Sequence, residues 1–175
     1  PFAVDLKGLS ELQGVSLRNV GLRILDARGR TVFSDVGEIL FTHFGLSGPM
    51  PLSASLHMDP KGKYSVVIDL KPGLDLVKLT GRIQRDLAAN SRKKIINAAT
   101  GLTLDSLVPV VFEASGVDGE KQAAQASKKD MQALARSLKN LEMEFTGFRS
   151  FDEAIVTAGG VDVREVDPRT LQSRI

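Results

Sequence analysis

Hydrophobic and polar residues alternate along the first part of the chain, as they do in strands with one buried face. Residues 15–27 follow this period-two pattern, which predicts a strand. Turn-forming residues at 26–29 and a second alternating run at 30–34 predict a hairpin. We expect further extended segments at 37–44 and 64–70, of which the second, Tyr-Ser-Val-Val-Ile-Asp-Leu, is the strongest strand candidate in the chain.

From residue 74 the apolar positions follow a helical period instead. Leucine, valine and isoleucine recur at helical spacing over 74–89, and Asn90 is expected to end this helix. A second helix is predicted at 93–99, before a glycine at position 101. The change of period therefore marks the start of a helical block.

The helical block ends with the clearest helix of the chain. Ser127 and Asp130 form a capping pattern in front of 128–139, which carries one apolar face. The apolar run 107–114 fits either a helix or a strand, and 117–126 is small and polar, as expected of a loop.

Strand character returns after the helices. Residues 141–148 alternate again, and the apolar segment 151–157 predicts one more strand, closed by two glycines. The order of strands, helices and strands predicts an α+β fold, with a small antiparallel β-barrel or sandwich interrupted by a helical subdomain. We expect the barrel to use residues 1–73 and 140–175, and the helical subdomain residues 74–139.

Candidate chemistry is densest in the segment 41–49, Phe-Thr-His-Phe-Gly-Leu-Ser-Gly-Pro. With Ser47 as N-cap and a short helix from Pro49 to about His57, the glycines and free N–H groups could hold an anion or the edge of a flavin. The alternative is a tight strand-to-helix turn in which His43 packs or caps. A nucleophile–base pair of His43 and Ser47 is disfavoured because no third, orienting group is identifiable.

A second glycine-containing motif, Thr-Ala-Gly-Gly-Val, occupies positions 157–161. Consecutive glycines after a strand let the backbone approach a flat ligand or another strand closely. A β-bulge or a hairpin turn explains the same residues without any ligand.

Charged residues form two groups that could be functional. The basic group could bind phosphates, although a solvated helix face explains it better, since no aromatic side chain is interleaved to stack on bases. Its members are Arg82, Arg85, Arg92, Lys93 and Lys94. Carboxylates at 152–153 and 162–167 could form a glycosidase pair, but they fit surface residues better.

Composition excludes several classes of function. The 175 residues include no cysteine and two histidines, so thiolate metal sites and cysteine nucleophiles are excluded and a zinc site is disfavoured. The net charge of +2 is weak support for nucleic-acid binding. No dinucleotide fingerprint, phosphate-binding loop, nucleophile elbow, signal peptide or membrane-spanning run is present, so we expect a cytoplasmic protein without a nucleotide-binding domain of its own.

Two segments together resemble a known family. Residues 37–49, Gly-Glu-Ile-Leu-Phe-Thr-His-Phe-Gly-Leu-Ser-Gly-Pro, and 154–163, Ala-Ile-Val-Thr-Ala-Gly-Gly-Val-Asp-Val, with the continuation 165–174, are similar to YhiN/BaiN-type (aminoacetone oxidase-like) flavoproteins. In that family a FAD-binding Rossmann domain is split by an inserted β-barrel with a helical subdomain. This chain resembles the insert plus the start of the return to the FAD domain, and its first residue, Pro1, also leads us to expect part of a longer protein.

The resemblance implies roles for particular residues. Thr157, Gly159, Gly160 and Val161 match the stretch that returns to the FAD domain, which implies contact with FAD. The segment with Thr42, His43, Gly45, Ser47 and Gly48 matches the motif expected to face the substrate cleft. Because the dinucleotide fingerprint and the late glycine-rich region of the family are both missing, the chain is not expected to hold FAD alone.

We therefore expect the insert domain of a FAD-dependent, NAD(P)-type oxidoreductase, which shapes the cleft of a small-molecule substrate and is inactive in isolation. Its expected partner is the Rossmann domain of the same parent chain. The alternative is a module built from a small barrel and a basic helical block that binds either nucleic acid or another protein. Of these two partners, nucleic acid is the less expected. No metal and no membrane association are expected.

Overall fold

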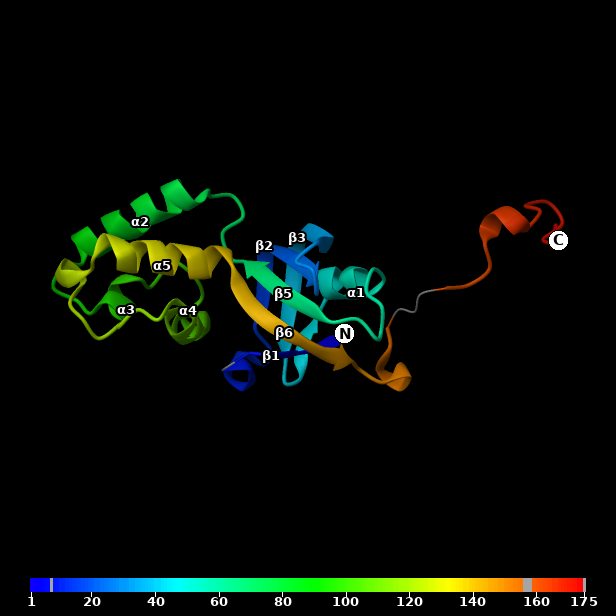
Figure 1. The fold of residues 1–175 in the computed structure, drawn as a ribbon, viewed down its shortest axis with the longest axis horizontal. Helices are drawn as coiled ribbons and strands as arrows, with labels where there is room; N and C mark the ends of the chain where they lie inside the picture. Colours follow the sequence, from blue (N-terminus) through cyan, green and yellow to red (C-terminus); the bar gives the residue numbers. More distant parts are fainter. Residues whose placement is uncertain (7, 156–158, 175) are drawn as a thin grey trace.

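Six antiparallel strands close into a barrel in the order β1-β4-β3-β2-β5-β6 (Figure 1). The structure is a computed structural model, and it describes residues 1–6, 8–155 and 159–174. The strands are β1 (Phe2–Asp5), β2 (Ser16–Asp26), β3 (Thr31–Thr42), β4 (Gly45–Ser47), β5 (Tyr64–Asp69) and β6 (Leu141–Phe148). The α+β class and the antiparallel barrel predicted from the sequence are confirmed, and the sandwich alternative is not needed.

The barrel closes through β1, which pairs with β4 on one side and with β6 on the other. Phe2 lies opposite Leu46 and Phe148 in these ladders, and its side chain is fully buried. The sequence pattern predicts neither β1 nor β4, because four and three residues are too few to show a period. Both strands are fixed by the neighbours that they join.

The long strands follow the predicted alternation. Leu22 and Ile24 of β2 face the inside of the barrel with Val66 and Ile68 of β5, and all four are fully buried. The strands expected at 15–27, 64–70 and 141–148 are confirmed. The segments 30–34 and 37–44, expected as two, form the single 12-residue strand β3.

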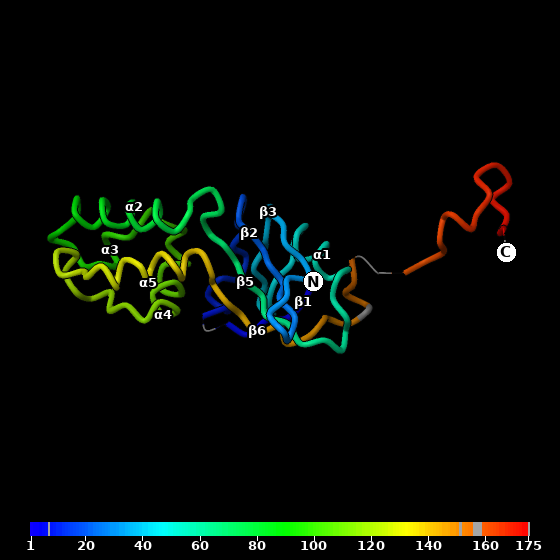
Figure 2. The backbone as a smooth tube through the Cα atoms, turned by 45° about the horizontal axis from the view of Figure 1, so that its top comes forward, coloured from blue at the N-terminus to red at the C-terminus, as the bar shows by residue number. Residues whose placement is uncertain are grey.

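Four helices lie between β5 and β6 in the sequence and beyond one end of the barrel in space (Figures 1 and 2). They are α2 (Leu76–Ala89), α3 (Ile95–Ala98), α4 (Val108–Ser115) and α5 (Lys128–Lys139). A further helix, α1 (Pro49–Ser55), packs on β3, where Met50 covers Gly37. Single 3-10 turns occupy Leu9–Leu12, Asp105–Leu107, Ala123–Gln125, Phe151–Glu153 and Val163–Glu165.

Local capping explains where the two main helices begin. The Asp75 carboxylate accepts a hydrogen bond from the Lys78 backbone N–H, which starts α2. A complete capping box of Ser127 and Asp130 starts α5, so this helix has its predicted bounds. The ambiguous run 107–114 is helical as α4, and the second expected helix is shorter than predicted, as α3.

Hydrogen bonds join the two chain crossings between the barrel and the helices. We call this region, residues 69–71 and 138–141, the seam. The Lys139 ammonium lies 2.5 Å from the Asp69 carboxylate and donates to the carbonyls of Lys71 and Leu74 at 3.0 and 2.8 Å. The Leu70 N–H donates to the Leu138 carbonyl at 2.8 Å.

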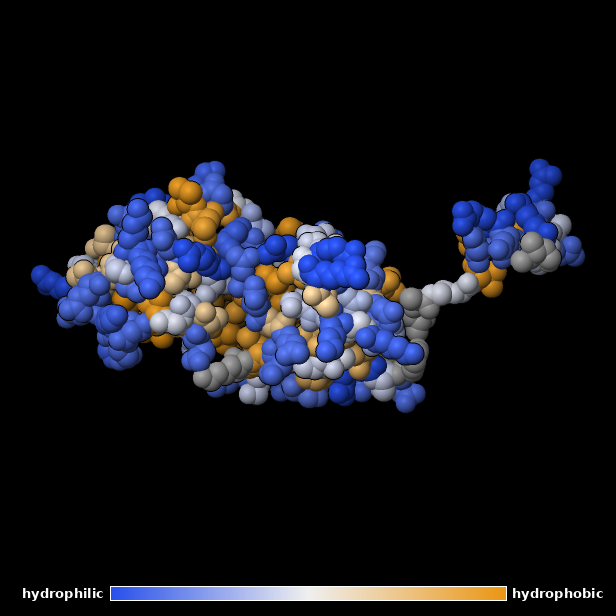
Figure 3. Space-filling view, viewed as in Figure 1, coloured by the Kyte–Doolittle hydropathy of each residue, from blue (hydrophilic) through white to orange (hydrophobic). Residues whose placement is uncertain are grey.

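Figure 3 shows hydrophobic residues gathered between the helices and the barrel on an otherwise largely hydrophilic face. The helices are therefore held to the barrel by both packing and paired charges.

Two local predictions are wrong. Residues 151–155 do not form a strand: Phe151–Glu153 is a 3-10 turn and the Ile155 side chain is exposed, while 156 and 157 lie outside the described residues. A closed barrel leaves no free edge for another strand, because β6 already pairs with β5 and β1. Ser47 is not an N-cap either, since it belongs to β4 and Gly48 precedes α1. Within the described residues, no helix is long and apolar enough to cross a membrane.

A matched pair of glycine substitutions tests the closure of the barrel. A Cβ on Gly45 would lie 2.4 Å from the Phe2 carbonyl oxygen, whereas a Cβ on Gly147 would meet nothing within 4 Å. The two residues have similar φ values, 156° and 149°, so the backbone cost of alanine is shared. We expect Gly45→Ala to lower the free energy of unfolding by about 2–3 kcal/mol more than Gly147→Ala in urea denaturation. Equal losses would contradict the tight contact of β1 with β4.

Candidate functional site

The reversal between β3 and β4 forms a short projecting hairpin with predicted cleft residues. The Thr42 hydroxyl donates to the Gly45 carbonyl at 3.1 Å, and the Gly45 N–H lies 3.2 Å from the same hydroxyl oxygen. Gly45 is buried against β1, where any side chain would collide with the backbone. This turn leaves His43 exposed at its tip and Phe44 half-buried beside it.

Side chains from the end of β6 gather around the tip of this hairpin. The His43 and Phe44 rings are edge to face at 5.0 Å, and the Arg149 guanidinium lies 4.7 Å from the centre of the Phe44 ring. Arg149 also forms a bidentate pair with Glu153, at 3.0 and 2.9 Å. We call His43, Phe44, Arg149 and Glu153 the hairpin cluster. Sequence reasoning singled out His43 but missed the association with Arg149, which is 106 positions away along the chain.

Electrostatics couple the members of the hairpin cluster. The hydrogen bonds and the charge of Arg149 hold the pKa of Glu153 below its usual value, and the nearby His43 acts in the same direction. The carboxylate therefore stays charged, and it holds the guanidinium over the aromatic ring. The cluster offers a cation, an imidazole and an aromatic face at one end of the barrel.

The remaining predicted cleft residues, Ser47 and Gly48, lead from this hairpin into α1. Pro49 and Pro51 lack N–H groups, so Met50 is the one residue among the first three of the helix with an N–H to offer. The anion-binding helix start considered from the sequence is therefore poorly equipped. Within the described part of the chain, no hydrogen bond joins Ser47 to His43, which agrees with the sequence argument against a nucleophile–base pair.

The described residues among those predicted to contact FAD lie apart from the barrel (Figure 1). Thr157 is outside the described residues, and Gly159, Gly160 and Val161 are exposed. The two glycines have φ values of 102° and 122°, and a Cβ on either one would meet nothing within 4 Å. The structure thus leaves this backbone open on its surface and does not bring it onto the hairpin cluster.

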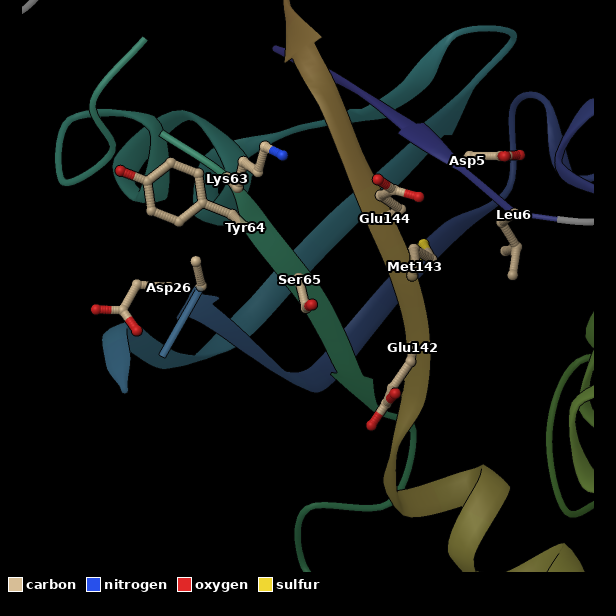
Figure 4. Close-up of a pocket in the computed structure, with 10 residues that line it drawn as sticks. Asp5, Leu6, Asp26, Lys63, Tyr64, Ser65, Glu142, Met143 and Glu144 are labelled. Atoms are coloured by element: carbon tan, nitrogen blue, oxygen red, sulfur yellow. The ribbon is translucent and has the colours of Figure 1, made fainter. Parts of the chain in front are cut away.

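An acidic groove of about 860 Å³ lies on the outer face of β1, β5 and β6 (Figure 4). Carboxylates of Asp5, Asp26, Glu142 and Glu144 line it, together with Lys63. Asp5 and Glu144 are directly opposite in the ladder of β1 and β6. No group of three potential ligands suited to a metal ion occurs among the residues that the structure describes.

Most of the predicted basic group lies on exposed surface of the helical block. Arg82 is 3.6 Å from Asp86, and Lys94 pairs with Glu120 at 2.5 Å. Arg85, Arg92 and Lys93 are exposed. These positions fit a solvated helix face and leave unpaired positive charge for a polyanion.

The barrel and its helical block define a known class of domain. The family model described as "HI0933-like protein barrel and H2TH domain" matches residues 1–156. The chain belongs to this family. The match includes the whole barrel, all five α-helices and the hairpin cluster.

Curated relatives add two kinds of activity. The chain is 32% identical over 99% of its length to a ribosomal RNA dihydrouridine synthase of Escherichia coli (strain K12), of which it covers 41%. It is 28% identical over 95% of its length to the enzyme with the same name in Haemophilus influenzae, covering 39% of it. It is also 29% identical over 83% of its length to a 3-dehydro-bile acid delta(4,6)-reductase of Clostridium scindens, covering 37%.

The chain thus spans about two-fifths of the length of these relatives. Its resemblance to the YhiN/BaiN-type flavoproteins is confirmed by the family match and by these relatives. The domain is therefore related to flavoprotein oxidoreductases.

The hairpin cluster makes a prediction about pH. Because Arg149 lowers the pKa of Glu153 in the folded chain, the stabilisation from this pair is present above the usual glutamate pKa and is lost as the pH falls through the lowered value. In Arg149→Gln we expect the Glu153 pKa, followed by NMR of the side-chain carboxyl carbon, to rise towards its usual value. Arg164→Gln, which breaks the similar pair with Asp162, is the control. An unchanged Glu153 pKa in Arg149→Gln would contradict the cluster.

Proposed function

We propose that this chain is the substrate-side insert of a FAD-dependent reductase, and that the enzyme reduces uridine in ribosomal RNA. The observation that carries the proposal is the similarity to the Escherichia coli ribosomal RNA dihydrouridine synthase over 99% of the chain. Because the chain covers 41% of that relative, the remainder is long enough to supply the FAD-binding Rossmann domain that this sequence lacks.

The geometry of the barrel supports an insert. β1 and β6 are antiparallel neighbours, with Phe2 opposite Phe148. The chain therefore enters the barrel and leaves it side by side, as an insertion into another domain requires. The hairpin cluster lies at this same end, so we place it next to the flanking domain, facing the reactive cleft.

The described residues fit a limited contact with FAD. The open backbone at Gly159 and Gly160 can lie against a flat ring system, and no side chain obstructs it. Thr157 and Val161 would flank this contact, as the family resemblance implies. When bound, FAD supplies hydride transfer; the hairpin cluster would line the cleft and exclude water, and the exposed His43 could hold a proton there.

Both activities named for the relatives fit one reaction class. Conversion of uridine to dihydrouridine, and reduction of a delta(4,6) 3-dehydro bile acid, each add a hydride and a proton across a carbon–carbon double bond conjugated with a carbonyl. We propose the same reaction here. RNA is the first candidate substrate, in place of the small molecule expected from the sequence, because the two relatives with that activity match 99% and 95% of the chain.

A small unsaturated carbonyl compound is the second candidate substrate. The Clostridium scindens reductase favours it, although the match covers less of the chain. For either substrate we propose that the chain consists of two units, a barrel of residues 1–73 and 140–175 and a helical unit of residues 74–139. We also propose that the enzyme acts in the cytoplasm. The pairing of the seam supports a fixed arrangement of the two.

The proposal predicts different behaviour of the chain and of the complete polypeptide that contains it. We expect the complete polypeptide to bind FAD and to oxidise a reduced nicotinamide with formation of dihydrouridine in unmodified ribosomal RNA. The 175-residue chain should neither bind FAD tightly nor turn over, because the pyrophosphate site lies elsewhere. Flavin absorbance and mass spectrometry of digested RNA measure the two outcomes.

Three results would contradict the proposal. Tight FAD binding and turnover by the 175-residue chain would show that it is not an insert. Reduction of a bile-acid dienone, with ribosomal RNA left unchanged by the complete polypeptide, would select the second substrate class. A complete polypeptide without flavin would reject both.

A further inference from the structure

A second groove, of about 510 Å³, lies where the helices meet the barrel. We call it the seam groove. It is lined by the beginning of β2, by the residues after β5 and by the loop between α3 and α4: Ser16, Leu17, Arg18, Val20, Leu70, Lys71, Gly101, Thr103 and Leu104. The groove shares no residue with the acidic groove and none with the hairpin cluster.

Lys71 is an unusual cation within the seam groove. Its backbone N–H donates to Asp69 and its carbonyl accepts from Lys139, but its ammonium has no hydrogen bond or ion pair with any described residue. Burial lowers the pKa of Lys71, and the positive charge of Arg82 lowers it further. The fold therefore holds a partly desolvated positive charge close to a second one.

Two arginines extend this positive charge along the groove. Arg82 reaches the groove wall, where its guanidinium donates to the Gly101 carbonyl at 3.3 Å, and it is 3.6 Å from Asp86. Arg18 lines the rim, is largely exposed, and is 3.6 Å from Glu38. By contrast, the nearby Lys139 is fully occupied by a carboxylate and two carbonyls. Lys71 is thus the cation of this region that is available for a ligand.

From this geometry we infer that the seam groove is a phosphate-binding site in which Lys71, with Arg82 and Arg18, holds the sugar–phosphate backbone of an RNA substrate. A phosphate placed there would be stabilised by the positive charges of both Lys71 and Arg82. The Thr103 hydroxyl adds a donor on the groove wall. The inference rests on the proposed function for its ligand, but the site is assigned from this chain alone.

A polynucleotide fits the seam groove better than a compact anion does. Leu104, whose side chain is 48% exposed, lines it beside the cations, and this aliphatic surface can pack against ribose, while a free phosphate would leave it uncovered. The groove contains no aromatic side chain, so bases are not expected to stack there. The acidic groove repels a polyanion from the outer face of β1, β5 and β6, so the two grooves together restrict how RNA approaches.

The test compares Lys71→Met with Lys78→Met. Both variants remove one lysine charge, but Lys78 is exposed and pairs with Asp75 at 3.2 Å outside the groove. Binding of a labelled ribosomal RNA hairpin by the complete polypeptide is measured by fluorescence anisotropy over a range of salt concentrations. We expect Lys71→Met to weaken binding roughly tenfold and to reduce the slope of log affinity against log salt by about one. Lys78→Met should change neither quantity appreciably.

Thermal unfolding of the same variants is the control for correct folding. Because the Lys71 ammonium has no hydrogen bond or ion pair with any described residue, its removal is not expected to lower the melting temperature. Equal weakening of RNA binding by the two variants, or none by Lys71→Met, would overturn the site. Weakened binding accompanied by a lower melting temperature would also overturn it, because Lys71 would then support the fold.

Other phosphate sources are separated by competition. Inorganic phosphate and NADP⁺ are added to the RNA complex and, separately, to the free protein, while the Lys71 side-chain carbon is followed by NMR. We expect RNA to raise the Lys71 pKa. Inorganic phosphate and NADP⁺, compared with RNA at the same occupancy of phosphate groups, should leave this pKa unchanged. A saturable shift with NADP⁺ but not with RNA would assign the groove to a nucleotide and overturn the RNA assignment.

The same experiments distinguish failure of this inference from failure of the proposed function. Oxidation of reduced nicotinamide by the flavin needs no RNA, so it reports on the reductase alone. If Lys71→Met leaves RNA binding unchanged in a polypeptide that still binds FAD and oxidises nicotinamide, this inference fails and the reductase stands. If the complete polypeptide holds no flavin, the proposed function fails whatever the RNA result.

Discussion

The pairing of β6 with both β5 and β1 is the interaction on which the rest of this structure depends. β6 starts directly after the last helix and closes the barrel opposite the first strand of the chain. Without this pairing Phe2, Met143 and Phe145 would lose the enclosed core in which they are buried. Closure also removes the free sheet edges that would otherwise invite aggregation.

Closure has two spatial consequences that separate the functions of the molecule. At one end it brings β1, the β3–β4 hairpin and Arg149 together, which creates the hairpin cluster. At the other end it fixes the seam, where Lys139 joins the two crossings of the chain. In the proposed function, the first end faces the flavin side of the parent enzyme and the second end binds RNA. The barrel between them would then set the distance over which a bound RNA presents a base.

Periodicity predicted the long elements because each buries one face continuously. The alternation of β2, β5 and β6 and the capping box of α5 follow from neighbours in the sequence, and they appear nearly as predicted. β1 and β4 could not be found in this way, since each is defined by pairing with distant strands. The wrong prediction of a strand has the opposite cause: the apolar run that includes 151–155 suits a strand, but the closed barrel offers these residues no partner.

The candidate sites depend even more on distant contacts. The glycine-rich segment 41–49 drew attention to His43, yet Arg149 joins it only because β6 ends beside the hairpin. The basic group predicted from the sequence includes Arg82 but not Lys71, which lies next to a turn. Nothing in the sequence indicates that the charge of Lys71 is unpaired. Its environment arises in the seam groove, which is lined by residues of β2, residues that follow β5 and residues of the α3–α4 loop. No local pattern encodes such a junction.

Amide hydrogen exchange in the complete polypeptide, with and without FAD, tests the proposed position of the flavin. We propose that the flavin lies at the hairpin end of the barrel and that the helical block lies away from it. FAD should therefore slow exchange in residues 42–48 and 159–161 and leave α2–α5 unchanged. Protection confined to α2–α5, or no protection of the hairpin, would contradict it.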